Sequence, residues 1–397
     1  MGALAEPLFR RYMIGNTLSL LGLWVQRVAL GWLTWELTHS GFWLGAIAFA
    51  DLFPTILIGP FAGVWADRRE RRQLVAQMQA VSCVLALLLY LLVLSGTQNI
   101  YLIFLLVLGI GSSAAVAQPA RLALIPGLVS KENLPAAVAM GSMAFNVSRF
   151  VGPMIAGAII ALADISLAFL FNALTYGAMA ISVATMPAGE TPGTKDAKVH
   201  ILSDIAAGFR YTLGHPLIGR LMYIMIAVAV LAKPLADLLP GFADLVFDRG
   251  VVGLAIMTQA MGIGSLLGGL LMTRTQGMTR LWRIAFFSLL ACGLTQLGFG
   301  QVSDFYVGLL ILFFASMAIT VAGISTQTMI QHVVQDNMRG RVLSIWGLIF
   351  RGGASLSLPL LGALADATHL GLTVSIAGGL CLLLSLPVIR TAPGLKD

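Results

Sequence analysis

Residues 59–73 read GPFAGVWADRRERRQ and lie between two long apolar runs. One aspartate and four arginines fall within residues 67–72, although only 10% of the chain is charged. In a water-soluble protein such a cluster would be an ordinary solvated face. Between two segments long enough to cross a membrane, it predicts a short cytoplasmic loop, and it sets the orientation of the segments on either side.

The composition indicates an α-helical membrane protein with many spans. Of the 397 residues 58% are hydrophobic, and the mean hydropathy is +0.91, whereas soluble domains carry about 25% charged residues. One crossing takes roughly 20 apolar residues, so twelve helices with short connections would nearly fill the chain. The apolar runs are continuous, which argues against a β-barrel. We therefore predict an all-α fold with twelve transmembrane helices in two pseudo-symmetric six-helix bundles.

The basic residues alternate from loop to loop. With the N-terminus placed in the cytoplasm, 19 of the 24 lysines and arginines lie at cytoplasmic ends and loops, and Arg249 alone lies in an outer loop. Lysine and arginine gather on the cytoplasmic side of membrane proteins. The pattern predicts twelve spans with both termini in the cytoplasm, and it argues against nucleic acid as a partner despite the net charge of +7.

The two halves of the chain resemble each other. Arg149 and Arg351 are 202 residues apart, and Arg27 and Lys233 are 206 apart. Two six-helix halves related as parallel repeats would explain this spacing. We expect three parts: an N-terminal bundle over residues 1–186, a cytoplasmic linker over 187–215 with a short surface helix near 201–213, and a C-terminal bundle over 216–397.

Several ionisable side chains lie inside the predicted helices, where each costs at least about 2.5–3.5 kcal/mol on insertion scales. Cations outnumber anions at mid-depth, so a cavity among them would favour an anionic or zwitterionic substrate. Structural pairing between the halves is the alternative for two of the arginines, Arg149 and Arg351. The predicted substrate path has four basic residues, with four polar or aromatic neighbours that would equally serve helix packing: Arg27, Arg149, Lys233 and Arg351, then Trp24, Gln26, Gln118 and Asn146.

Asp51 is the leading candidate for carrying a proton. Desolvation raises the pKa of a carboxyl group in a membrane and a nearby arginine lowers it, so the two effects can place titration near the working pH. A permanent salt bridge to Arg27 or Arg149 is the alternative. Asp237 is the second candidate, but it lies four residues after Lys233, so a local ion pair would also explain it.

Residues 63–72, GVWADRRERR, resemble the loop signature between the second and third helices of the major facilitator superfamily, Gly-x-Leu-Ala-Asp-Arg-x-Gly-Arg-Arg. Glu70 stands where that signature has Gly. In that family the loop aspartate meets the start of the eleventh helix and the arginines pair with acidic groups. The resemblance implies that Asp67 faces residues 337–341, and a loop that only sets the topology is the alternative. The implied conformational latch comprises Gly63, Asp67, Arg68, Arg71 and Arg72.

Residues 151–157, VGPMIAG, resemble the core of the antiporter signature, Gly-Pro-x-x-Gly-Gly. The resemblance favours export over uptake. Gly152, Pro153 and Gly157 would bend the helix predicted at residues 135–163, and a purely structural kink is the alternative. With further matches along the chain, the sequence is similar to bacterial exporters related to the enterobactin exporter and macrolide efflux proteins.

These features together predict a secondary active transporter: a proton-coupled exporter of a small amphiphilic or anionic molecule such as a siderophore, drug or lipid-like compound. An uncoupled facilitator or a lysolipid flippase of the same fold is the alternative. We expect no enzymatic activity, no cofactor and no metal site. The expected partners are the lipid bilayer, a small-molecule substrate and protons, and the expected setting is a monomer in a bacterial inner membrane.

Overall fold

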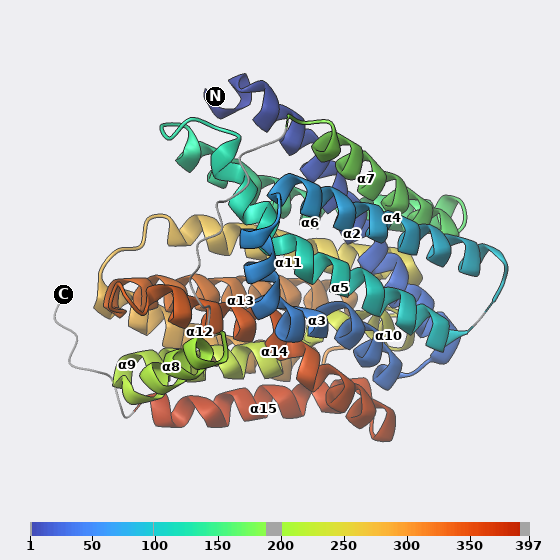
Figure 1. Ribbon diagram of the computed structural model, residues 1–397. Coiled ribbons are helices and arrows are strands. Elements are labelled where there is room, and N and C mark those ends of the chain that lie inside the picture. Colours follow the sequence, from blue (N-terminus) through green and yellow to red (C-terminus); the bar gives the residue numbers. More distant parts are fainter. Residues whose placement is uncertain (1, 98, 188–200, 390–397) are drawn as a thin grey trace. The chain divides into compact units, whose positions relative to one another are not determined.

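The computed structural model describes residues 2–97, 99–187 and 201–389, and within these ranges the ordered elements are helices, with no strand (Figure 1). The side chains of Val64, Asp67, Ile201, Leu202 and Asp204 lie outside the description. Among the described residues, eleven helices are long and apolar enough to cross a membrane. The 32-residue helix α2 (Pro7–Thr38), which carries Arg27 and Glu36, completes the predicted twelve.

The first half of the chain begins with a four-residue helix, α1 (Gly2–Ala5), followed by α2 and five further long helices. The charged stretch is more helical than predicted, because α3 continues to Arg68 and α4 starts at Arg71. Only Arg69 and Glu70 separate the two helices. The bounds are α3 Gly41–Arg68, α4 Arg71–Leu94, α5 Ile100–Leu124, the 3₁₀ turn η1 Ile125–Gly127, α6 Leu134–Leu162 and α7 Ser166–Ala184.

The second half begins with the predicted short helix, α8 (Ile201–Gly214), and ends with α15. Its first membrane segment, residues 216–246, alternates between α-helical and π-helical turns. The bounds are α9 Pro216–Ala227, the π-helical η2 Val228–Ala232, α10 Leu235–Gly241, the π-helical η3 Phe242–Val246, α11 Gly250–Met272, α12 Met278–Phe299, α13 Phe305–Val333, α14 Arg339–Ala367 and α15 Leu370–Ile389.

The chain divides into two compact units by internal packing. Unit 1 comprises residues 1–37 and 50–199, and unit 2 comprises 38–49 and 200–397. Helix α3 is therefore shared, because its first turns pack with unit 2 and the rest with unit 1. The bundle boundaries read from the sequence stay a prediction.

Each unit has its own core. In unit 1, α4 packs along α5 and α7 (Figure 1), around buried side chains such as Phe9, Leu74 and Met179. In unit 2, α13 packs against both α11 and α12, and α12 also packs against α15. Buried residues of unit 2 include Ile218 and Trp346. Many other large apolar side chains are exposed, as expected for helices whose outer faces meet lipid.

Candidate functional site

Unit 1 contains an ion pair between two predicted site residues. Arg27 of α2 donates a hydrogen bond through Nη2 to Oδ2 of Asp51 on α3, at 2.8 Å. The two side chains keep 38% and 21% of their surface exposed, respectively. Both side chains are therefore half-buried. The sequence left the partner of Asp51 open between Arg27 and Arg149, and the structure places Arg27 in this contact.

Trp24 lies close to both arginines of unit 1. The guanidinium carbon of Arg27 is 5.3 Å from the centroid of the indole ring, and that of Arg149 is 5.6 Å away. Phe145 meets the same ring edge-on, with centroids 5.9 Å apart. Spacings of three residues on α2 and four on α6 bring these side chains to one face of each helix. The four side chains Trp24, Arg27, Asp51 and Arg149 are hereafter the unit 1 cluster.

Two glycines bring the helix backbones of this cluster close together. A methyl group at Gly152 of α6 would overlap the Cβ atom of Trp24, so only glycine allows this approach. A methyl group at Gly111 of α5 would lie 2.5 Å from the carbonyl oxygen of Asp51. Pro153 and Gly157, next to Gly152 in the antiporter-like stretch, are buried in α6. The bend predicted there stays a prediction.

The other polar candidates of unit 1 lie in three different settings. Gln26 is 5% exposed, and its Oε1 accepts a hydrogen bond from Nδ2 of Asn172 on α7 at 2.8 Å. A buried side chain bonded in this way holds α2 against α7. Asn146 is half-buried and donates to the carbonyl of Ser142 on its own helix at 2.9 Å. Gln118 is half-buried on α5.

Lys233, a basic candidate of unit 2, lies against the ring of Phe350. Its ammonium group donates to the carbonyl oxygen of Phe350 and sits 4.4 Å from the centroid of that ring. Trp346 stacks on Phe350 with centroids 5.0 Å apart and planes 11° from parallel. Trp346 also donates through Nε1 to Oγ1 of Thr326 at 3.2 Å. Lys233, Trp346 and Phe350 are hereafter the unit 2 cluster.

The two remaining charged candidates of unit 2 lie nearby in the chain. Asp237 is half-buried on α10, one turn after Lys233, and Arg351 is exposed on α14, next to Phe350. Whether these residues line a path for substrate stays a prediction.

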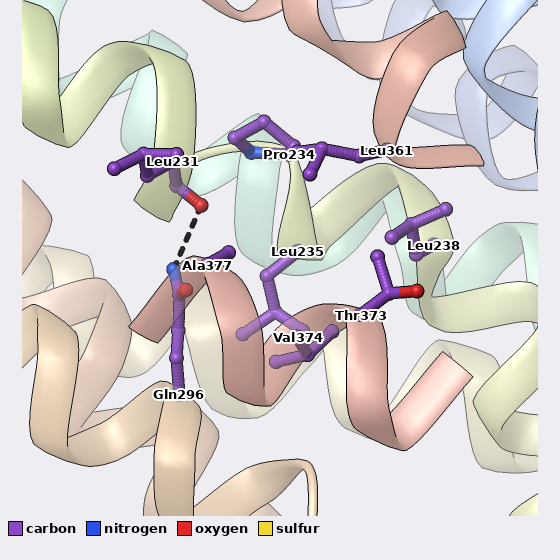
Figure 2. A pocket seen from close by; sticks show the side chains of 9 residues that line it. All are labelled: Leu231, Pro234, Leu235, Leu238, Gln296, Leu361, Thr373, Val374 and Ala377. Carbon is purple, nitrogen blue, oxygen red and sulfur yellow. Dashed lines mark hydrogen bonds between the residues drawn. The ribbon is translucent and has the colours of Figure 1, made fainter. Parts of the chain in front are cut away.

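A helix break places Lys233 where it is. Pro234 has no N–H group, so the carbonyl of Val230 four residues earlier cannot receive its usual helical bond. Ser357 of α14 donates to this carbonyl instead, at 2.7 Å. The next carbonyl, Leu231, accepts from Nε2 of Gln296 on α12 at 3.0 Å, as Figure 2 shows. Side chains from neighbouring helices thus satisfy the groups that the break leaves free, as the absence of water in lipid requires.

A small pocket adjoins this break. Figure 2 shows its lining, in which Gln296 and Thr373 are the polar members and the others are apolar: Leu231, Pro234, Leu235, Leu238, Leu361, Val374 and Ala377. The sequence did not single out Gln296 or Ser357. Their signal would have been the proline itself, which guarantees an unpaired carbonyl four residues earlier.

The charged stretch of unit 1 binds helix C-termini. Arg71 donates through Nη1 to the carbonyl of Ala123 at 3.1 Å, and Arg72 donates through Nη1 to Ala184 and Met186 at 2.7 Å each. Cations stabilise the negative end of the helix dipole. Glu70, the departure from the family signature, accepts from Nε of Arg72 at 2.7 Å. It therefore orients one of the arginines.

The other latch candidates give less information. Arg68 is exposed, and among the described side chains and neighbouring helices nothing lies within 4 Å of a methyl group placed at Gly63. The side chain of Asp67 lies outside the described part of the structure. Its predicted position opposite residues 337–341 stays a prediction.

Two carboxylates with clear roles in the packing were not among the predicted site residues. Glu6 accepts from the backbone N–H and the hydroxyl of Ser130 and from Nδ2 of Asn133, at 2.8–3.1 Å. Asp366, at the end of α14, accepts from the backbone N–H groups at the start of α3. The residues of each contact are far apart in sequence, so no local pattern reveals them.

Comparisons with known proteins agree with this architecture. A family model described as transmembrane secretion effector matches residues 1–393. The enterobactin exporter EntS of Escherichia coli O1:K1 / APEC is 25% identical over 395 residues, which cover 97% of this chain and 93% of that protein. EntS of Shigella boydii serotype 18 (strain CDC 3083-94 / BS512) has the same identity and coverage.

Solved transporter structures share the fold. The nucleoside transporter NupG has a TM-score of 0.73 at 13% identity, with 97% of this chain and 98% of that chain covered. A bacterial homologue of the human lysosomal transporter Spinster has a TM-score of 0.74 at 14% identity, with 97% and 98% covered. The chain therefore belongs to the transmembrane secretion effector family within the major facilitator superfamily, and it is a multi-pass membrane transporter with the twelve-helix fold.

Proposed function

We propose that this protein is a proton-coupled exporter that works by alternating access on a small amphiphilic or anionic molecule. Its similarity to proteins named enterobactin exporter supports export and points to siderophore-like compounds. Drugs and lipid-like molecules belong to the same chemical range. The proposed setting is the bacterial inner membrane with both termini in the cytoplasm, where the protein would act as a monomer.

The observation that carries this proposal is the ion pair between Arg27 and Asp51 beside Trp24. The unit 1 cluster holds two arginines and one carboxylate, so its formal charge is +1, and protonation of Asp51 would raise it to +2. A proton arriving at one carboxylate would thus change the field around an aromatic surface that two guanidinium groups flank. That is the local event that a coupled transporter needs.

Exchange of substrate for protons requires that the two compete. They compete if the substrate donates a hydrogen bond to the carboxylate of Asp51, because the proton occupies the same acceptor. A purely anionic group would instead bind better once Asp51 is neutral. We therefore propose a substrate with a hydroxyl or ammonium donor for Asp51, and with an aromatic or anionic part for Trp24 and Arg149.

Replacement of Asp51 tests the coupling. Asp51→Asn protein in proteoliposomes should lose accumulation driven by a pH gradient by about tenfold or more, while downhill exchange of the probe continues. The probe is radiolabelled enterobactin, with an anionic amphiphilic dye as the second compound. Asp336→Asn, which removes the exposed partner of Arg339 just before the start of α14, is the matched control. Undiminished gradient-driven accumulation by Asp51→Asn would show that Asp51 does not couple.

The alternative is an uncoupled facilitator or a lysolipid flippase. A permanent ion pair between Arg27 and Asp51 would favour uncoupled transport, because the carboxylate would then stay ionised throughout the cycle. Transport by the wild-type protein that ignores a pH gradient altogether would establish this alternative.

The charged stretch, residues 59–73, is proposed as the conformational latch, with Asp67 as its central residue. Asp67→Asn should slow transport severalfold and leave substrate binding nearly unchanged. Measurements of flux and of binding on the same preparation separate the two effects. A loss confined to binding would count against the latch.

A further inference from the structure

The N-terminus of α3 is held by a carboxylate from the other end of the chain. Oδ1 of Asp366 accepts from the N–H of Gly41 at 2.6 Å, and Oδ2 accepts from the N–H of Phe42 at 3.1 Å and from the hydroxyl of Ser40 at 2.6 Å. The first N–H groups of a helix have no partner within the helix, and its positive end attracts an anion. These contacts, hereafter the Asp366 cap, lie within unit 2.

Glycines on both helices make the cap possible. A methyl group at Gly362 of α14 would overlap the carbonyl oxygen of Gly41, and one at Gly45 would lie 2.5 Å from the carbonyl carbon of Leu358. Gly41 and Gly45 of α3 thus face Gly362 and Leu358 of α14, respectively, and the two helix backbones are in contact. This close packing supports the cap along two turns of each helix.

The N-terminus of α3 also has a substitute partner. The hydroxyl oxygen of Ser40 accepts from the N–H of Trp43 at 3.4 Å, which is a local cap of the ordinary kind. If Asp366 withdrew, this contact could shorten and keep the first turn of α3 helical. Because Ser40 can replace Asp366 as the cap of α3, the contact between Asp366 and α3 can open reversibly without unwinding the helix.

We propose that the Asp366 cap is a lock that opens once in each transport cycle. Residues 38–49 belong to the first half of the chain, yet they pack with unit 2. Alternating access requires the halves of such a transporter to part at one end and then at the other. Asp366 holds the start of α3 to α14 at the end opposite the charged loop, so it sets the stability of the state closed at that end. This role rests on the proposed alternating-access transport.

Cysteine accessibility tests the lock without any substrate. Ala46 of α3 is 7% exposed, and Ala46→Cys, in a background lacking Cys83, Cys292 and Cys381, reports whether this segment is covered. Asp366→Asn should raise the rate at which a membrane-impermeant maleimide labels this cysteine by about tenfold, because charge-assisted bonds are lost. Gly362→Ala should act in the same direction, since its methyl group pushes Gly41 away.

Matched controls make the result decisive. Asp336→Asn removes a carboxylate just before the start of α14, and Gly347→Ala adds a methyl group where nothing lies within 4 Å. Neither should change the labelling of Ala46→Cys. Equal labelling rates in Asp366→Asn and Asp336→Asn proteins would overturn the lock.

A reversible cross-link tests whether the lock must open. A Cβ atom at Gly41 would lie 3.1 Å from the Cβ of Ala365 and 2.8 Å from the carbonyl oxygen of Gly362. A small backbone shift relieves the second contact and brings the two Cβ atoms to the separation of about 3.8 Å that a disulfide needs, so Gly41→Cys with Ala365→Cys should form a disulfide on oxidation. The oxidised and reduced forms share this shift, so their difference reports the cross-link alone. Oxidised protein should move enterobactin at least about tenfold more slowly than reduced protein, and a reductant should restore the rate. Full transport by cross-linked protein would overturn the proposal. If wild-type protein moves no probe at all, the proposed function fails, whereas the labelling result still decides the lock.

Discussion

The two clusters stabilise membrane-embedded cations in different ways. In unit 1, Arg27 bonds to the carboxylate of Asp51 beside the ring of Trp24. In unit 2, Lys233 bonds to the backbone carbonyl of Phe350 and lies against the ring of the same residue. A carboxylate has a titratable proton site, which a backbone carbonyl lacks. Arg27 and Lys233, which the sequence predicts to be equivalent positions of a repeat, therefore lie in different chemical settings.

This difference suggests a division of labour. The unit 1 cluster is partly exposed and contains a carboxylate, as the proposed coupling requires. The unit 2 cluster is anchored by the buried Trp346 and by a helix break in which the carbonyls of Val230 and Leu231 are bonded to side chains, so it suits a fixed surface. Four experiments test this contrast between the two clusters.

The largest expected effect is on stability in unit 2. Trp346 is 7% exposed, stacks on Phe350 and donates to Thr326, so Trp346→Ala should cost about 3–5 kcal/mol. Unfolding of the purified protein in mixed micelles measures the loss. Trp65, 53% exposed, is the control, and Trp65→Ala should change stability by less than about 0.5 kcal/mol. Equal losses at the two sites would show that the unit 2 cluster is not an anchor.

Disturbing the close contact between α2 and α6 in unit 1 should give the next largest loss of stability. Gly152→Ala places a methyl group against the Cβ of Trp24, and the resulting displacement should cost about 1–3 kcal/mol. Gly141, on the same helix, has nothing within 4 Å of an added methyl group. Gly141→Ala should therefore be neutral or mildly stabilising. If both variants unfold at the same temperature, close packing does not hold Trp24 in place.

The ion pair of unit 1 should show measurable but modest coupling. A double-mutant cycle with Arg27→Gln and Asp51→Asn should give about 1 kcal/mol, because both side chains are partly exposed. A value near zero would mean that the pair does not hold the cluster together. A value above about 3 kcal/mol would favour the permanent ion pair and the uncoupled alternative.

The smallest effect concerns Glu6, a carboxylate of unit 1 held by neutral donors instead of an arginine. Its hydrogen bonds to Ser130, backbone first, and to Asn133 lower the pKa of Glu6 below its ordinary value of 4.5. The stabilisation is therefore present above pH 4.5 and is lost as the pH falls through the lower folded-state value.

The measurement for Glu6 is the difference in melting temperature between wild type and Glu6→Gln, followed from pH 7 to pH 3. The difference should be positive at neutral pH and vanish in acid. A difference that does not change with pH would rule out this linkage.

Much of the fold could be predicted from the sequence, because hydropathy and the distribution of basic residues report membrane insertion directly. The number of helices, the short helix α8 and the membrane positions of Arg27, Asp51 and Lys233 follow from that signal. Element ends were less predictable. Helix α4 starts within the charged stretch, where the side chains of Arg71 and Arg72 bind the ends of other helices and Arg72 also binds Glu70. Composition alone does not show these contacts.

The contacts across long sequence distances could not be predicted. Nothing near Asp366 indicates that it binds the start of α3, since the partner is more than 300 residues away. The spacing of Gly41 and Gly45 predicts a close helix contact, but it does not name the partner helix. Likewise, Pro234 predicts an unpaired backbone carbonyl, whereas only the fold shows that the hydroxyl of Ser357 donates a hydrogen bond to the carbonyl of Val230.

The division of α3 between two units has a consequence for biosynthesis. Gly41 and Asp366 are separated by 325 residues, which a ribosome needs on the order of 15–65 s to translate. Throughout that time the first turns of α3 stand in the membrane without their final neighbour, and the buried faces of Leu44 and Ile47 meet lipid or the insertion machinery instead. Truncated nascent chains that end before α14 should therefore be recognised by membrane quality control, even though unit 1 is otherwise nearly complete.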